Sequence, residues 1–101
     1  MIADAVSLHL WQQHIRDLDI KNFSDALNLG AFPRLMTLNL CNNQIGDTGI
    51  SYLSSSIKKK TMVLLYNLAL DRNQIGDEGF CQFSESLQYL PNLNKLSISN
   101  N

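Results

Sequence analysis

Few residues in this chain have side chains suited to catalysis, and they are widely spaced. Two histidines, His9 and His14, offer an imidazole base, and two cysteines, Cys41 and Cys81, offer a thiol nucleophile. A cysteine nucleophile needs a base within hydrogen-bond reach. The cysteines stand 40 positions apart, which is not the spacing of a zinc or redox motif. Whether any of these groups meet depends on the elements that position them.

The sequence contains no motif for binding a metal ion or a phosphate group. The acidic residues near the expected turns do not follow the spacing of a calcium-binding loop; they are Asp17, Asp19, Asp47 and Asp77. The glycines do not form a phosphate-binding loop, because they recur as part of a long internal period. We therefore expect no metal, no cofactor and no catalytic residue.

An internal repeat positions all of these residues. Leucine recurs in steps of 30, 30 and 28 residues, at Leu8, Leu38, Leu68 and Leu96. A second apolar column lies two residues further on, at Leu10, Leu40, Leu70 and Ile98. A third lies three residues before the first, at Ala5, Leu35, Leu65 and Leu93. Leu-x-Leu alternation predicts a short strand with one buried face in each repeat.

The second half of each complete repeat predicts a helix. Apolar residues there follow an i, i+3, i+7 pattern, at Ile20, Phe23 and Leu27, at Ile50, Leu53 and Ile57, and at Phe80, Phe83 and Leu87. Asp47 and Asp77 stand just before the pattern, where Asp is a good N-cap. Gly49 and Gly79 recur in the first turn, where we expect them to permit close packing against the neighbouring repeat.

A polar amide follows each strand at one fixed position. The column is Gln13, Asn43, Asn73 and Asn101. An inward Asn amide both donates and accepts, so it can satisfy backbone groups where the chain turns sharply and bond to the next repeat. The alternative is that Asn43 and Asn73 are ordinary surface turn residues.

These columns resemble the leucine-rich repeat pattern L-x-x-L-x-L-x-x-N-x-L. The repeat length and the segments Ile45–Gly49 and Ile75–Gly79, both I-G-D-x-G, resemble the ribonuclease-inhibitor-like subclass. The resemblance extends over residues 5–101. The first repeat departs from the pattern, because Gln13 replaces Asn and Arg16–Asp19 replaces Gly-Asp-x-Gly.

The resemblance implies an open α/β solenoid with parallel strands on the concave face and helices on the convex face. We expect a single domain, 1–101, with repeats at about 5–34, 35–64 and 65–92 and a partial repeat at 93–101. Leu93, Leu96 and Ile98 would form a terminal strand with no covering unit, which is an association hazard. We therefore expect a fragment of a longer array, and self-association through this strand is the alternative.

The strand residues between the leucines should face outward on the concave sheet. We choose the candidate protein-binding residues from this face and its rim: His9, Trp11, Asn39, Cys41, Asp71, Arg72 and Lys95. Trp and Arg are enriched at interface hot spots, which favours Trp11 and Arg72 as anchors. The alternative for Trp11 is that it packs over the open N-terminal end.

The predicted sheet also argues against a Cys-His nucleophile. His9 and Cys41 would lie on adjacent strands but in different side-chain rows, about 8 Å apart. That separation is too long for the hydrogen bond that activates a thiol. Asp71 would neighbour Cys41 and disfavour its thiolate.

Charge and composition exclude further classes of function. The formal net charge is -1 and charged residues make up 17%, which argues against a nucleic-acid binder. No apolar run approaches the roughly 18 residues that a membrane span needs. The run Lys58–Lys60 is expected to be a solvated helix end, and a nuclear-localisation role is the alternative. We expect a cytoplasmic protein, with a nuclear location possible, because the cysteine usage fits a reducing compartment.

The resemblance implies a non-catalytic module that binds a protein partner. The alternative is a regulator of another enzyme, either inhibitor-type or GTPase-activating. An inhibitor of basic ribonucleases should be strongly acidic, and a net charge of -1 counts against that version. A GTPase-activating role would depend on Arg72, the one arginine near the concave rim.

Overall fold

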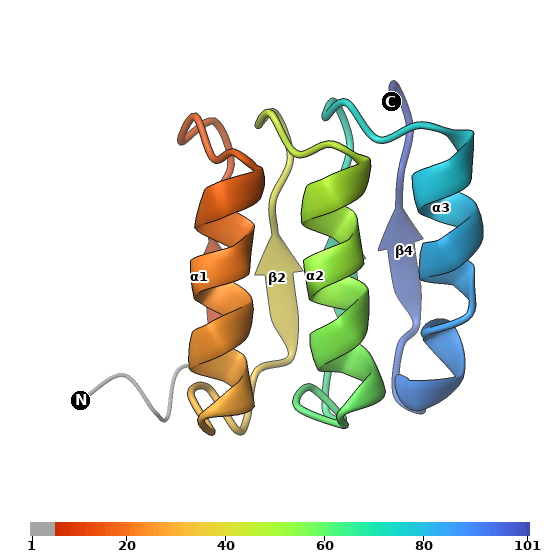
Figure 1. The fold of residues 1–101 in the computed structure, drawn as a ribbon. Coiled ribbons are helices and arrows are strands. Elements are labelled where there is room, and N and C mark those ends of the chain that lie inside the picture. The colour runs from red at the N-terminus through yellow and green to blue at the C-terminus, as the bar shows by residue number, and fades with distance from the viewer. Residues whose placement is uncertain (1–5) are drawn as a thin grey trace.

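The structure is a computed structural model that describes residues 6–101. It repeats a strand followed by a helix three times and ends with a fourth strand (Figure 1). The elements in chain order are β1 Ser7–His9, α1 Asp17–Asn28, β2 Thr37–Asn39, α2 Asp47–Lys58, β3 Asn67–Ala69, α3 Asp77–Ser84, the 3-10 helix η1 Leu87–Tyr89 and β4 Lys95–Ser97. Ala5, which the repeat pattern includes, lies outside the described residues.

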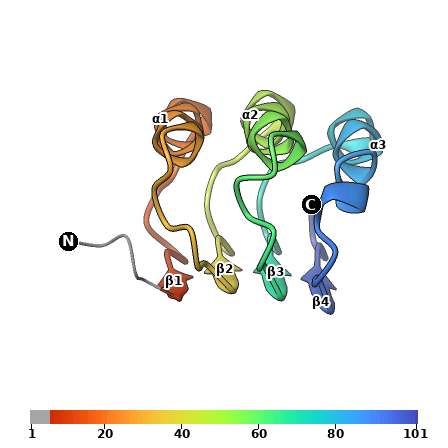
Figure 2. The same ribbon diagram turned by 90° about the horizontal axis from the view of Figure 1, so that it is seen from below.

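The four strands form one parallel sheet in the order β1-β2-β3-β4. Their register aligns the first leucine column, Leu8 with Leu38, Leu68 and Leu96. The helices form a second layer and are spaced more widely than the strands (Figure 2). Packed helices need about 8–10 Å and paired strands about 4.8 Å, so the stack curves with the sheet on its concave side. The predicted α/β solenoid is confirmed.

The core lies between the two layers and is filled by the repeated apolar columns. The inward leucines of the two inner strands are completely buried, namely Leu38, Leu40, Leu68 and Leu70. The apolar face of α2 is buried equally well, through Ile50, Leu53 and Ile57. In the last strand region, Leu96 and Ile98 remain 38% and 40% exposed. Their columns are therefore buried only where another repeat covers them.

The third helix is shorter than its pattern predicts. Helices α1 and α2 each have 12 residues, whereas α3 has 8 and ends at Ser84. Leu87, expected on the same helical face as Phe83, lies in the separate turn η1. The third repeat has two residues fewer, and the buried Ser86 hydroxyl donates to the Phe83 carbonyl, a local bond that competes with helix continuation. None of the described helices is long and apolar enough to cross a membrane.

The asparagine column holds successive repeats together. The Asn43 Oδ1 accepts hydrogen bonds from the backbone N–H groups of Gln13 and Ile15 at 2.9 and 3.0 Å. Its Nδ2 donates to the carbonyls of Leu10 and Leu40, both at 3.0 Å. Asn43 and Asn73 are only 7% and 8% exposed, so the surface-turn alternative is wrong. The amides bond to the preceding repeat, not to the following one as predicted.

The repeated aspartates differ from their predicted role. Asp47 was expected to cap α2, but Gly46 occupies the N-cap and no side chain caps it. Asp47 is instead the first helical residue, and its Oδ1 accepts from the Gly76 N–H of the following repeat at 2.7 Å. Asp17 bonds Gly46 in the same way, also at 2.7 Å. The side chain fits across the junction because Gly79, in the first turn of the neighbouring helix, has no Cβ, which would overlap Asp47 Oδ1.

Candidate functional site

The outward face of the sheet carries rows of side chains from successive strands. One row runs along His9, Asn39, Ala69 and Ser97, whose strands pair in register. His9 is exposed, and Asn39 is half-buried. Asn39 Oδ1 accepts from the Cys41 N–H at 3.0 Å, which leaves its amide nitrogen for other contacts. The concave face thus presents small and polar groups at its centre.

An apolar row borders this face where the chain enters the strands. We name it the strand-entry row; it comprises Val6, Met36 and Tyr66. The residues directly precede β1, β2 and β3, and they are 46%, 42% and 42% exposed. Because the strands are in register, the three side chains belong to adjacent positions. The candidates chosen from the sequence omit this row. The sequence feature that could have identified the row is an apolar residue directly before the strand in three repeats.

Trp11 follows β1 at the opposite end of the strands and is 50% exposed. The equivalent positions in the later repeats are Cys41, Asp71 and Ser99. A half-exposed indole combines a large apolar area with a hydrogen-bond donor, a combination suited to protein contact. Trp11 therefore has the exposure that a contact residue needs.

Asp71 is occupied by bonds within the fold. Its Oδ2 accepts from the Ser97 hydroxyl at 2.5 Å, and its Oδ1 accepts from the Ser99 N–H at 2.7 Å. The Ser97 bond, followed by the bonds from Ser99, lowers the pKa of this carboxyl. The carboxylate fastens the third repeat to the last strand segment, and both of its oxygens are already engaged.

Cys41 has an environment that keeps it a thiol. Burial raises the pKa of Cys41, and the neighbouring Asp71 charge raises it further. Burial is the largest cause, and the hydrogen bond with the Asp71 backbone acts in the opposite direction and lowers the pKa of Cys41, so only the carboxylate of Asp71 acts in the predicted direction. Since the thiolate is the nucleophile, Cys41 is poorly suited to covalent catalysis. Cys41 and Cys81 are both free cysteines.

Arg72 lies on a rim built from left-handed residues. Its φ is 58°, and the equivalent residues Gln12, Asn42 and Asn100 have φ values of 55°, 58° and 59°. This repeated turn projects the rim residues beyond the strand ends. Arg72 is exposed, as is Lys95 at the start of β4. Neither side chain makes an ion pair within the described part of the chain.

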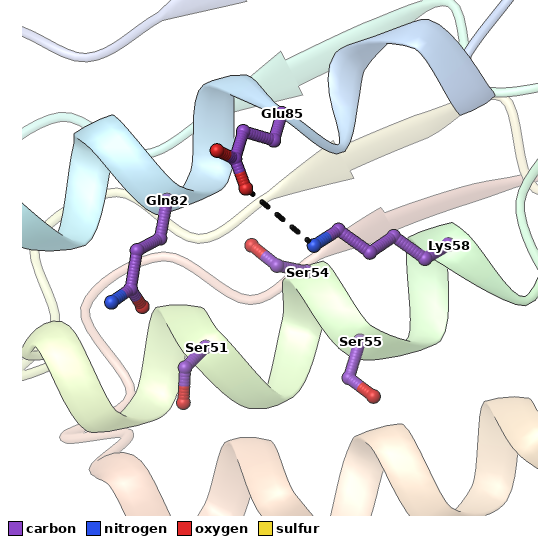
Figure 3. Close-up of a pocket in the computed structure, with 6 residues that line it drawn as sticks. All are labelled: Ser51, Ser54, Ser55, Lys58, Gln82 and Glu85. Carbon is purple, nitrogen blue, oxygen red and sulfur yellow. Dashed lines mark ion pairs between the residues drawn. The ribbon is translucent and has the colours of Figure 1, made fainter.

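A second concavity lies on the convex side, between α2 and α3 (Figure 3). It is an open groove of about 470 Å³, lined by Ser51, Ser54, Ser55, Lys58, Gln82 and Glu85. Lys58 Nζ and Glu85 Oε1 lie 3.9 Å apart across it, and both side chains are substantially exposed. Ligand pockets are mostly apolar and enclose their ligand. This groove has neither property and resembles a solvated gap between helices.

Residues 6–101 contain no group of three or more His, Cys, Asp or Glu side chains placed to hold a metal ion. His9 and His14 are exposed and lie on different parts of the first repeat. The arrangement as a whole offers a rigid surface with aligned side chains, which is suited to recognising another macromolecule.

The fold and this face define a repeat solenoid, a class in which stacked units present an extended binding surface. A family model described as Leucine Rich repeat matches residues 34–54, which include β2 and most of α2. No curated protein matches the chain. The family match supports a leucine-rich repeat protein, a kind that is generally non-catalytic and commonly binds proteins.

Proposed function

We propose that this chain binds a protein partner through the exposed face of its parallel sheet. The observation that carries the proposal is the strand-entry row, whose three apolar side chains stay 42–46% exposed on adjacent strands. Exposed apolar groups aligned on a rigid support favour association, because their burial removes apolar area from water. Trp11 supplies a further anchor at the other end of β1, with 50% of its surface exposed.

The polar residues of the face have different roles in this proposal. His9, Arg72 and Lys95 are exposed and available for contact. Asp71 stabilises the face and does not contact the partner directly, because both of its carboxylate oxygens already accept hydrogen bonds within the fold. Asn39 and Cys41 are half-buried and set the shape of the centre.

The size of the face limits the affinity. Four strands about 4.8 Å apart and three residues long give a concave patch of roughly 140 Å². A standard interface takes about 800 Å² from each partner. The strand-entry row enlarges the patch, and a tight complex would need further surface from loops or additional repeats.

The test compares two substitutions in the row with a matched control elsewhere. Tyr66→Asp and Met36→Asp place a charge in the proposed interface, whereas Leu29→Asp changes an apolar residue that is 90% exposed at the end of α1. Proteins captured by the unaltered chain are purified and titrated against all three variants. We expect Tyr66→Asp and Met36→Asp to weaken binding by at least about tenfold, or about 1.4 kcal/mol, and Leu29→Asp to leave it unchanged. Equal effects of all three variants would contradict the proposal.

Arg72 supports a second candidate function, regulation of another enzyme such as a GTPase. An arginine supplied to a GTPase active site stabilises transition-state charge. Arg72 is exposed on the rim and free of ion pairs among the described residues. GTP hydrolysis by small GTPases should then be accelerated by the chain and not by Arg72→Ala. If no tested GTPase responds to the unaltered chain, this candidate is removed. An inhibitor-type role is less well supported, because the net charge is only -1.

We also infer the ribonuclease-inhibitor-like subclass and a cytoplasmic or nuclear location. The subclass is supported by a helix in each complete repeat and by the Gly-Asp-x-Gly segments at Gly46–Gly49 and Gly76–Gly79. The location is supported by two free cysteines, of which Cys81 is exposed. Thiol labelling of the protein in intact cells should find both cysteines reduced.

A further inference from the structure

Charged side chains are distributed unevenly between the two ends of the strands. The segments that run from a helix into the next strand lie at one end, which we call the entry end, and the turns after the strands lie at the other, the exit end (Figure 1). Each helix begins with an aspartate at the exit end, namely Asp17, Asp47 and Asp77. The entry end carries Arg34 before β2, Lys58–Lys60 where α2 ends, and Lys95 at the start of β4. Asp25 near the end of α1 and Glu85 just after α3 each face a lysine, at 3.2 and 3.9 Å. The entry end therefore attracts an acidic partner, and the exit end repels it.

Two of these cations flank an apolar patch that overlaps the strand-entry row. We call it the entry patch; it comprises Met36, Leu64 and Tyr66, each 42% exposed. The Met36 carbonyl accepts from the Tyr66 N–H at 2.7 Å, so these two residues lie side by side. Arg34 occupies the position in the second repeat that Leu64 occupies in the third. The Lys95 N–H donates to the Tyr66 carbonyl at 3.0 Å, so the patch has Arg34 on one side and Lys95 on the other.

The distance between the two cations matches the repeat of an extended chain. Lys95 is in register with Asn67 and Thr37, and Arg34 lies three positions before Thr37. Two strand spacings of about 4.8 Å and a rise of about 3.3 Å per residue place the Cα atoms of Arg34 and Lys95 roughly 14 Å apart. Residues i and i+4 of an extended segment are about 13 Å apart. Both cations are exposed and make no ion pair within residues 6–101.

We propose that the entry patch binds an extended segment of the protein partner with the pattern acidic-x-apolar-x-acidic. Alternate side chains of an extended segment share one face, so the two carboxylates and the apolar side chain between them would all point toward the patch. The carboxylates would pair with Arg34 and Lys95, and the apolar side chain would cover Met36 and Tyr66. This inference rests on the proposed function, because it names the chemistry of the partner that the exposed face binds.

An anionic membrane is the other partner that a basic and apolar surface attracts. In the last repeat, however, the two columns of the entry patch continue as Asn92 and Asn94, which are both exposed. A bilayer that covered the patch would also cover these amides, and burying unpaired amides costs free energy. A single extended segment needs only the strip between Arg34 and Lys95, which favours a protein segment.

The test measures the binding of three end-blocked peptides to the full chain by NMR chemical shifts. The first peptide is Gly-Glu-Ser-Phe-Ser-Glu-Gly. The second has Gln in place of both Glu residues, and the third, Gly-Glu-Phe-Ser-Ser-Glu-Gly, turns Phe to the opposite face without changing the composition. We expect the first peptide to bind at least about threefold more tightly than either control and to shift the signals of Met36 and Tyr66.

Substitutions in the chain identify the cations that the peptide contacts. Arg34→Gln and Lys95→Gln should each weaken binding of the first peptide by about two- to fivefold and leave binding of the Gln peptide unchanged. Lys21→Gln is the matched control, because it removes an exposed lysine on α1 that faces Asp25. The thermal midpoint of each variant establishes that it is folded.

The proposal is overturned if the first peptide does not bind, if either control peptide binds equally well, or if Lys21→Gln has the same effect as Arg34→Gln. Binding to vesicles of phosphatidylcholine and phosphatidylserine without binding to the first peptide would identify a membrane and also overturn it. If the peptides fail while Tyr66→Asp still weakens binding of the captured partner, only this inference is wrong. If Tyr66→Asp has no effect on that partner, the proposed function is wrong as well.

Discussion

Replacing Asn73 by alanine tests the physical basis of the fold most directly. The Asn73 Oδ1 accepts from the Ile45 N–H at 3.1 Å, and its Nδ2 donates to the Leu40 and Leu70 carbonyls at 2.9 and 3.1 Å. All three bonds are buried. Alanine removes the amide and provides neither a donor nor an acceptor in its place.

The expected loss of unfolding free energy depends on which hydrogen bonds each backbone group retains after the substitution. The Ile45 N–H loses the partner that the structure gives it, and an unsatisfied buried donor costs about 1–3 kcal/mol. The two carbonyls keep a second donor, since Asn43 also bonds Leu40 and Asn101 also bonds Leu70. Each then loses a bond worth about 0.5–1.5 kcal/mol. Asn73→Ala should therefore destabilise the chain by roughly 2 to 6 kcal/mol, a large share of the typical 5–15 kcal/mol.

Asn101 provides a matched control at the exposed end of the same column. Its amide makes equivalent bonds, with the Asn73 N–H at 3.1 Å and the Leu70 carbonyl at 2.9 Å, but the residue is exposed. Water can replace those bonds, so Asn101→Ala should cost less than about 1 kcal/mol. Urea unfolding followed by circular dichroism measures both. Equal losses of unfolding free energy in the two variants, or a loss below about 1 kcal/mol for Asn73→Ala, would refute the argument. The asparagine column would then not stabilise the fold by satisfying buried backbone groups.

Three further predictions concern single side chains. The folded pKa of Asp71 is lowered chiefly by Ser97. The carboxylate therefore contributes stability above its unfolded pKa of about 3.9, and this stability is lost as the pH falls through the folded pKa. Ser97→Ala should make the loss of stability on acidification smaller, as measured by unfolding at a series of pH values. Ser24 has a buried hydroxyl with no hydrogen-bond partner, so Ser24→Ala should leave the unfolding free energy unchanged or raise it by about 1 kcal/mol. A decrease above about 1 kcal/mol would show that the hydroxyl does have a hydrogen-bond partner in the folded protein. Arg72 has a φ of 58°, so Arg72→Gly should raise the thermal midpoint, by an amount equivalent to about 1 kcal/mol, and a lowered midpoint would show that its side chain stabilises the rim.

The sequence predicts those features that depend on residue type at a repeated position. The leucine columns specify the strands because alternation leaves only one face to bury, and Leu38 and Leu68 are completely buried as expected. The role of Asp47 was not predictable in the same way. An aspartate at a helix start satisfies the N-cap pattern, and only the offset between neighbouring helices reveals that its carboxylate reaches Gly76.

The candidate site was less predictable, because side-chain type does not reveal which groups are already bonded. Asp71 has the charge of an interface anchor, yet Ser97 and Ser99 occupy both of its oxygens. Their involvement depends on the register of β4 against β3, which the sequence specifies only through the repeat length. The position of Met36 and Tyr66 is apolar without being leucine, so it resembles an ordinary variable position until its exposure is measured.

The links between repeats are directional, and this explains how short strands make a stable stack. Strands of three residues provide few ladder bonds. Asn43 bonds backward to the first repeat, while Asp47 bonds forward to Gly76, so the second repeat is fastened on both sides. An inverted neighbour would satisfy neither residue, and the sheet is parallel throughout. Because each link involves only adjacent repeats, the free energy of unfolding should increase with each junction that is added. Repeats linked on one side only should therefore be the least stable part of the stack.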